Sequence, residues 1–326
     1  MRILIVLLVL SLSSFLTVVA APRATGVHDL TQAPADWHGG SGDDESDDES
    51  SDEPIVLVAE YFLTDPATSF DAVIAGEPAG RLTWQPDDPA FPGDVPGSLT
   101  ALYDSSLPTL LFGLALQDTL DESRTFTAGA VLVIEPEGFV ADPSGFAQIS
   151  WGLWNSIATG LDRTGTLETT ADCYELVEFD WFPNQTAFGG PFISPAVFGV
   201  ADPPGGDAFG NFSTLFDLEA TLPLGVPLLV VIEHRPGPDA AVAQVYRIVG
   251  EQEVTPVDGA VALAPLDGLA PRQYELDAVG LTLWKDGFDG LFGPSPAVRA
   301  SVVYHAVVLV EGLVGRPEDL LNVPGE

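Results

Sequence analysis

Three observations predict that this chain folds as an all-β domain. Between residues 54 and 313, short runs rich in Val, Ile, Phe and Tyr alternate with clusters of Gly, Pro and Asp, which is the pattern of strands separated by turns. No long run shows the period of an amphipathic helix. No internal repeat of fixed period is present. Many short strands without intervening helices are typical of a sandwich or a barrel, and they argue against a parallel α/β sheet.

The first 20 residues have the pattern of an export signal. A single Arg precedes an apolar run, which ends in the small residues Val18, Val19 and Ala20 before a cleavage point. A transmembrane anchor is the alternative, because the run approaches the roughly 20 residues that span a bilayer. We therefore expect a secreted protein, extracellular or periplasmic, with no stable membrane insertion after the signal is cleaved.

Residues 21–53 predict a linker, and the charge of the whole chain restricts its partners. The linker ends in GGSGDDESDDESSDE, where like charges repel and no apolar period occurs, so we expect it to be disordered and extended. The chain has 11 Lys and Arg against 48 Asp and Glu, a net charge of -37. A phosphate backbone would be repelled, so nucleic acid is excluded as a partner.

One domain, residues 54–313, holds the candidate strands, and residues 314–326 read as a polar tail. Two long segments, 62–123 and 185–226, are expected to carry loops that could surround a binding surface. The predicted strands are 55–61, 69–74, 125–134, 146–154, 174–182, 228–234, 242–249, 274–284 and 297–310.

The strand predicted at 174–182 carries the only hint of chemistry. Alternation places Val177, Phe179 and Trp181 on an apolar face, and it places Glu178 and Asp180 together on the opposite face. In a two-sheet sandwich that opposite side would be an exposed surface, where extended ligands such as glycans commonly lie. The two carboxylates are therefore the first candidates for a site.

The run VEFDWFPN, residues 177–184, resembles the metal-site strand of legume-type (L-type) lectins. The resemblance implies a two-sheet antiparallel jelly roll of the concanavalin A-like fold. It also implies metal ligation by Glu178, Asp180, the carbonyl of Phe182 and Asn184, with calcium as the cofactor. The Asp and the His that follow in the family are absent here, where Phe188-Gly189-Gly190 and Ile193-Ser194-Pro195 stand. A metal-free polar strand is the alternative.

The resemblance implies a non-catalytic module that binds carbohydrate or interacts with a surface, with glycan as the expected partner. Sugar rings stack on aromatic side chains, so Trp154, Asn155 and Trp181 are the candidate ligand-binding residues. A structural or adhesive domain without a ligand site is an alternative from another class.

A glycoside hydrolase is a further alternative, because laminarinase-type enzymes carry E-x-D-x-E or E-x-D-x-x-E on one strand. Glu178 and Asp180 fit the first two places, but the third falls on Phe182 or Pro183, which cannot donate a proton. His234 and His305 are the only histidines of the predicted domain, which excludes a metal site built from several histidines. His305 lies in an apolar strand, so we expect it to be packed and hydrogen-bonded.

Overall fold

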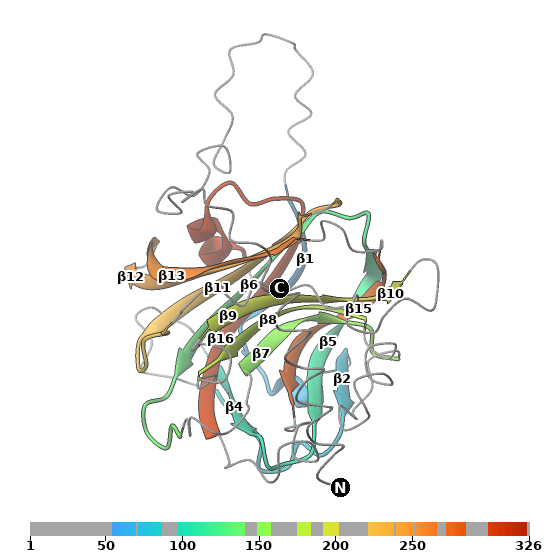
Figure 1. The fold of residues 1–326 in the computed structure, drawn as a ribbon. Coiled ribbons are helices and arrows are strands. Elements are labelled where there is room, and N and C mark those ends of the chain that lie inside the picture. Colours follow the sequence, from blue (N-terminus) through green and yellow to red (C-terminus); the bar gives the residue numbers. More distant parts are fainter. Residues whose placement is uncertain are drawn as a thin grey trace, which may run out of the picture. The chain divides into compact units, whose positions relative to one another are not determined.

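The computed structural model describes residues 54–69, 71–86, 97–140, 149–157, 175–183, 192–201, 221–237, 239–250, 252–265, 272–284 and 299–324. These residues form two antiparallel sheets that lie face to face (Figure 1). The predicted export signal at 1–20 and the acidic linker at 21–53 lie outside the described residues, so both stay predictions.

One sheet has eight strands. Its order is β13 (Glu253–Pro265), β12 (Asp239–Gly250), β11 (Pro227–His234), β6 (Phe126–Ile134), β16 (Arg299–Glu311), β4 (Ser98–Asp104) and β3 (Leu82–Gln85). The eighth strand, β1 (Ile55–Glu60), pairs with the C-terminal half of β16. The last long strand of the chain therefore joins the first strand to the middle of the sheet.

The other sheet has six strands. Its order is β2 (Ala72–Ala75), β5 (Leu110–Asp121), β15 (Glu275–Leu283), β7 (Ile149–Trp154), β8 (Leu176–Phe182) and β9 (Phe192–Phe198). Two short strands, β10 (Val200–Ala201) and β14 (Arg272–Gln273), pair separately, and a 3-10 turn, η1, spans Pro66–Thr68 between β1 and β2. Most spatial neighbours are not neighbours in sequence, because the chain crosses between the sheets. The fold is the predicted jelly-roll sandwich.

The main core fills the space between the sheets. Every second residue of a strand points inward, and the inward residues of both sheets form one buried cluster. Its largest fully buried members are Phe126 and Tyr304 from the eight-stranded sheet and Trp151 and Phe179 from the six-stranded sheet.

All nine predicted strands are present, with ends that differ by a few residues. The prediction of long loops was wrong, because 62–123 also holds β3, β4 and β5, and 185–226 holds β9 and β10. Pro195 in β9 and Pro256 in β13 hid those two strands, since proline removes a ladder donor. Both strands lie at sheet edges, where proline is tolerated.

The segment predicted as a polar tail packs on the eight-stranded sheet instead. Residues Pro317–Asn322 form a 3-10 helix, η5, whose Leu320 is only 2% exposed and joins a second apolar cluster with Leu229 and Val308. A Cβ on Gly129 would lie 2.9 Å from Leu320 Cδ1, so the glycine makes room for this side chain. Within the described ranges, no helix has the length and apolar character needed to cross a bilayer.

Replacing Leu320 by Ala should lower the free energy of unfolding by about 2–4 kcal/mol, because it leaves a cavity above Gly129. Urea denaturation would measure this loss. Leu313, which is 36% exposed, provides the control, and Leu313→Ala should change the free energy of unfolding by less than about 0.5 kcal/mol. Equal losses in the two variants would contradict the packing role of Leu320.

Candidate functional site

Strand β8 has the side-chain alternation that the sequence predicts. Val177, Phe179 and Trp181 belong to the core between the sheets. Glu178 and Asp180 therefore lie on the opposite side, which we call the outer face of the six-stranded sheet. Their exposed fractions are 0% and 1%, so this face is covered there and does not form the open surface that was expected.

The polar side chains of the outer face come from three adjacent strands. Thr282 of β15 pairs with Ser150 of β7, which pairs with Asp180 of β8. The Ser150 hydroxyl donates to Asp180 Oδ1, and Thr282 Oγ1 donates to Glu178 Oε2 at 2.7 Å. Each carboxylate thus receives a hydrogen bond from a buried hydroxyl on another strand.

A row of glycines lies beside these polar residues. Gly113, Gly280 and Gly152 are in register across β5, β15 and β7, and Gly152 pairs with Glu178. A Cβ on Gly152 would lie 2.3 Å from the carbonyl oxygen of Val177, and one on Gly280 would lie 2.1 Å from that of Phe112. No side chain fits at these positions, so Thr282 and Glu178 can meet across a bare stretch of backbone.

Trp154 covers the far end of the glycine row. A Cβ on Gly113 would lie 2.8 Å from Trp154 Cζ2, so the indole extends from β7 across β15 to β5. Trp154 is fully buried in a third apolar cluster with Leu111, Leu176, Ala278 and Trp284. Its indole nitrogen has no hydrogen-bond partner among the residues that the structure describes. The outer face therefore has an apolar half around Trp154 and a polar half around Asp180.

The other two predicted ligand-binding residues occupy different surroundings. Trp181 lies in the core and stacks on Phe139, with ring centroids 6.0 Å apart, so it points away from the outer face. Asn155 is partly exposed at the end of β7, where its Nδ2 donates to Glu175 Oε2 at 3.1 Å and its Oδ1 accepts from the backbone of Ile157. These bonds hold the turn after β7.

The predicted metal ligands are brought together only in part. Glu178 and Asp180 share the outer face, and alternation puts the buried side chain of Phe182 on the same face. Asn184 lies outside the described residues. Calcium takes six to eight oxygen ligands, and the described part of the chain contains no group of three or more Asp, Glu, His or Cys that could hold a metal. These residues alone do not complete a calcium shell.

Two buried tyrosines support the site from the core, and no local pattern in the sequence predicted them. Tyr103 Oη donates to the carbonyl oxygen of Ser150 at 2.7 Å and lies 2.7 Å from Tyr304 Oη. Burial raises the pKa of Tyr103 well above its usual value, and Tyr304 and then Glu178 raise it further. The contact links β4 of one sheet to β7 of the other, directly beneath the Ser150 hydroxyl.

A retaining hydrolase of the laminarinase type would need a third carboxylate facing Glu178. The positions beside it on the neighbouring strands are Gly152 and Ser150 of β7 and Ala196 and Ser194 of β9, with Gly280 and Thr282 of β15 one strand further. None of them can act as a general acid, so the described residues do not supply this mechanism.

No protein-family model and no curated protein matches the chain. It is similar to solved structures of the Emp47p carbohydrate recognition domain, at 12% identity and a TM-score of 0.39 over 73% of this chain and 100% of that one. Basic winged bean lectin with Tn-antigen has 12% identity and a TM-score of 0.38, over 74% and 99% of the two chains. Alginate lyase vAL-1 from Chlorella virus has 16% and 0.37, over 68% and 88%. The first two are of the lectin type that the motif resembles.

Thr282→Val should lower the free energy of unfolding by about 1–3 kcal/mol, because it removes the hydroxyl that donates to a buried oxygen of Glu178 while keeping the side-chain volume. Thermal or urea unfolding near pH 7 would measure the loss. Thr282→Ser keeps the hydroxyl and should retain most of the stability. If both variants lose the same amount, the methyl group rather than the hydrogen bond is responsible.

Proposed function

We propose that this protein is a secreted, non-catalytic module that binds carbohydrate or another surface ligand through the outer face of the six-stranded sheet. The observation that carries the proposal is the pair of buried carboxylates, Glu178 and Asp180, with their hydroxyl donors Ser150 and Thr282. Burying carboxylates costs free energy, and apolar side chains of similar volume often serve a structural face as well or better. The apolar half around Trp154 shows that apolar side chains can fill this face of the same sheet.

The two carboxylates suit a ligand that is rich in hydroxyl groups. A carboxylate has two oxygens and about four acceptor positions, and the bonds from Ser150 and Thr282 hold the two carboxylates in a fixed orientation. Sugar hydroxyls donate readily to such fixed acceptors. In this proposal the same carboxylates bind calcium, and the carbonyl of Phe182 and Asn184 are the further ligands.

The burial of the site has a kinetic consequence. Because Glu178 and Asp180 are at most 1% exposed, a ligand reaches them only after the cover of the outer face moves. Association that needs a conformational change is slower than the usual 10⁵–10⁷ M⁻¹s⁻¹. Slow association is therefore part of the proposed function.

A structural or adhesive domain without a ligand site is the second candidate. The apolar half of the outer face favours it, because Trp154, Leu176 and Leu111 are fully buried there. In this case the hydroxyl-to-carboxylate bonds would serve only to satisfy polar groups in a covered face.

Thermal unfolding with EDTA and then with excess calcium tests the metal part of the proposal. A ligand of the native state at a hundredfold over its dissociation constant adds about 2.7 kcal/mol of stability, which should raise the melting temperature of the unmodified protein. Asp180→Asn keeps the shape of the side chain but removes the charge, so it should abolish the rise. Asp71→Asn, at an exposed position, is the matched control and should leave the rise intact.

Binding to an array of glycans, with and without calcium, tests the ligand itself. Glycan binding that Asp180→Asn weakens at least tenfold, with Asp71→Asn unaffected, supports the proposal, whether or not calcium is needed. If no glycan binds and calcium has no effect on unfolding, the structural candidate replaces it.

A further inference from the structure

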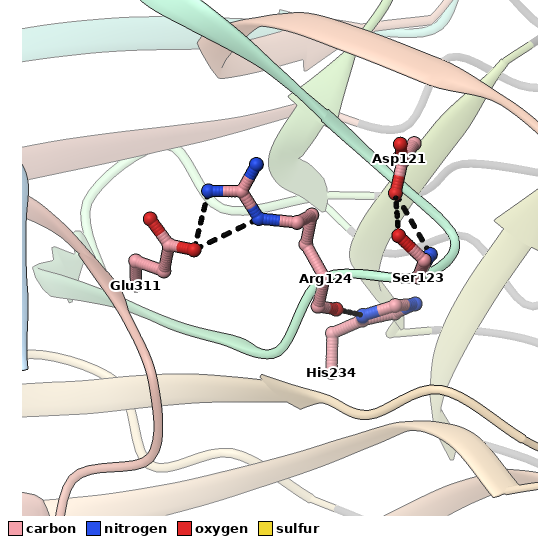
Figure 2. Close-up of polar contacts among 5 residues, drawn as sticks. All are labelled: Asp121, Ser123, Arg124, His234 and Glu311. Atoms are coloured by element: carbon pink, nitrogen blue, oxygen red, sulfur yellow. Dashed lines mark hydrogen bonds and ion pairs between the residues drawn. The ribbon is translucent and has the colours of Figure 1, made fainter. Parts of the chain in front are cut away.

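The turn at residues 121–125 connects the two sheets, since it joins β5 of the six-stranded sheet to β6 of the eight-stranded one. Figure 2 shows how its side chains are held. Arg124 Nε and Nη2 both donate to Glu311 Oε1 at the end of β16, with 2.8 Å from Nε. Asp121 Oδ1 accepts from the backbone N–H and the hydroxyl of Ser123. The turn therefore carries its own side-chain bonds and one ion pair to the eight-stranded sheet.

His234, the last residue of β11, contacts the same turn from the core side. Its ring is fully buried and stacks on Phe126, with centroids 4.5 Å apart and an interplanar angle of 8°. Nδ1 lies 2.7 Å from the carbonyl oxygen of Arg124, and Nε2 contacts the hydroxyl of Tyr274, which immediately precedes β15. One imidazole thus connects the eight-stranded sheet to the turn and to the six-stranded sheet.

The partners of the ring determine its protonation. A carbonyl oxygen can only accept, so Nδ1 must carry a hydrogen. In a neutral ring Nε2 is then the acceptor, and the Tyr274 hydroxyl donates to it. A second proton on Nε2 would turn this nitrogen into a donor and would force the phenol to rotate its hydrogen away. It would also place a cation in a site without exposed surface.

We propose that His234 is an acid-sensitive latch. While its ring is neutral, it joins the two sheets at the turn 121–125, and when the ring is protonated it releases the contacts between this turn and Tyr274. We call this region, residues 121–125 with His234 and Tyr274, the corner. The latch is distinct from the proposed ligand site, because Phe126 and Tyr274, which contact the ring of His234, belong to the core between the sheets.

The surroundings of the ring both lower and raise the pKa of His234. Burial lowers the pKa of His234 to about 4, while the bond to the Arg124 carbonyl and the charge of Asp121 partly offset this effect. The other titratable groups at the corner are Glu122, which accepts from the Tyr274 backbone, Arg124 with Glu311, Tyr274, and the flanking pair Glu233 and Arg235. The open corner takes up a proton near the usual pKa of about 6.5 and the closed one only near 4. Closure is therefore favoured above about pH 6.5 and weakens as the pH falls towards 4.

Native-state hydrogen exchange of the intact chain tests the latch. The backbone N–H groups of Arg124, Tyr274 and Gly312 are all bonded at the turn. Their opening constants, after correction for the intrinsic exchange rate, should rise by up to about tenfold per pH unit between pH 6.5 and 4. The N–H of Gly225, bonded to Ile134 at the other end of β6, is the internal control and should not show this rise.

Two substitutions separate the histidine from the nearby carboxylates. His234→Gln keeps every acidic group of the corner and should remove the pH-dependent rise in the opening constant of the Arg124 N–H. Tyr274→Phe removes the donor to Nε2 and should raise the pKa of the closed state, so the rise in the opening constant should end at a higher pH and be smaller. A rise that persists in His234→Gln, or that is unchanged in Tyr274→Phe, would overturn the proposal.

The unmodified protein provides a test that does not depend on the variants folding. The ring of His234, recognised in NMR spectra by its contact with Phe126, should titrate well below the free-histidine value. The opening constant of the Arg124 N–H should rise as the pH falls towards this titration. Titration near pH 6.5, or an equal rise in the opening constant at Gly225, would show general acid unfolding and no latch.

Discussion

The register of β7, β8 and β15 is the constraint on which the outer face depends. Side chains alternate with a period of two, so a slip by one residue would send Glu178 and Asp180 into the core and Phe179 out of it. The apolar inner face opposes such a slip. The bond from Tyr103 to the Ser150 carbonyl adds a contact between the sheets that exists in one register only. The packing of the core thus sets the register of these strands, and the register determines which polar groups meet on the other side of the sheet.

The outer face combines two kinds of packing, and the glycines make both possible. Where Gly113 leaves the backbone bare, the indole of Trp154 lies against the sheet. Where Gly152 leaves it bare, Glu178 and Thr282 reach one another. A side chain on any of these glycines would press on backbone atoms of the next strand, which cannot move aside without distorting the ladder. A small set of positions therefore controls the shape of the whole face.

Local patterns in the sequence predicted the sandwich, nine of its strands and the division of β8 into two faces, because a strand's face follows from alternation alone. Of the strands that they missed, β9 and β13 contain proline, which is compatible with an edge, but only the finished sheet shows which strands are edges. They also missed the cover over Glu178 and Asp180 and the contacts of Tyr103 and His234. Those contacts join residues far apart in the chain, as with Tyr103 and Tyr304, and no local spacing reports them.

Both ends of the described fold are held on the eight-stranded sheet. β1 begins beside Gly312, where the space for a Cβ reaches Pro54 at 3.8 Å, and the hydroxyl of Tyr61 donates to the carbonyl of Val323 near the other end. Neither end leaves from the six-stranded sheet. A fusion partner, an affinity tag or a coupling to a solid support could be attached at either terminus of the domain without standing on the face that carries Glu178 and Asp180. The domain is thus suited to immobilised display with the attachment point on the eight-stranded sheet.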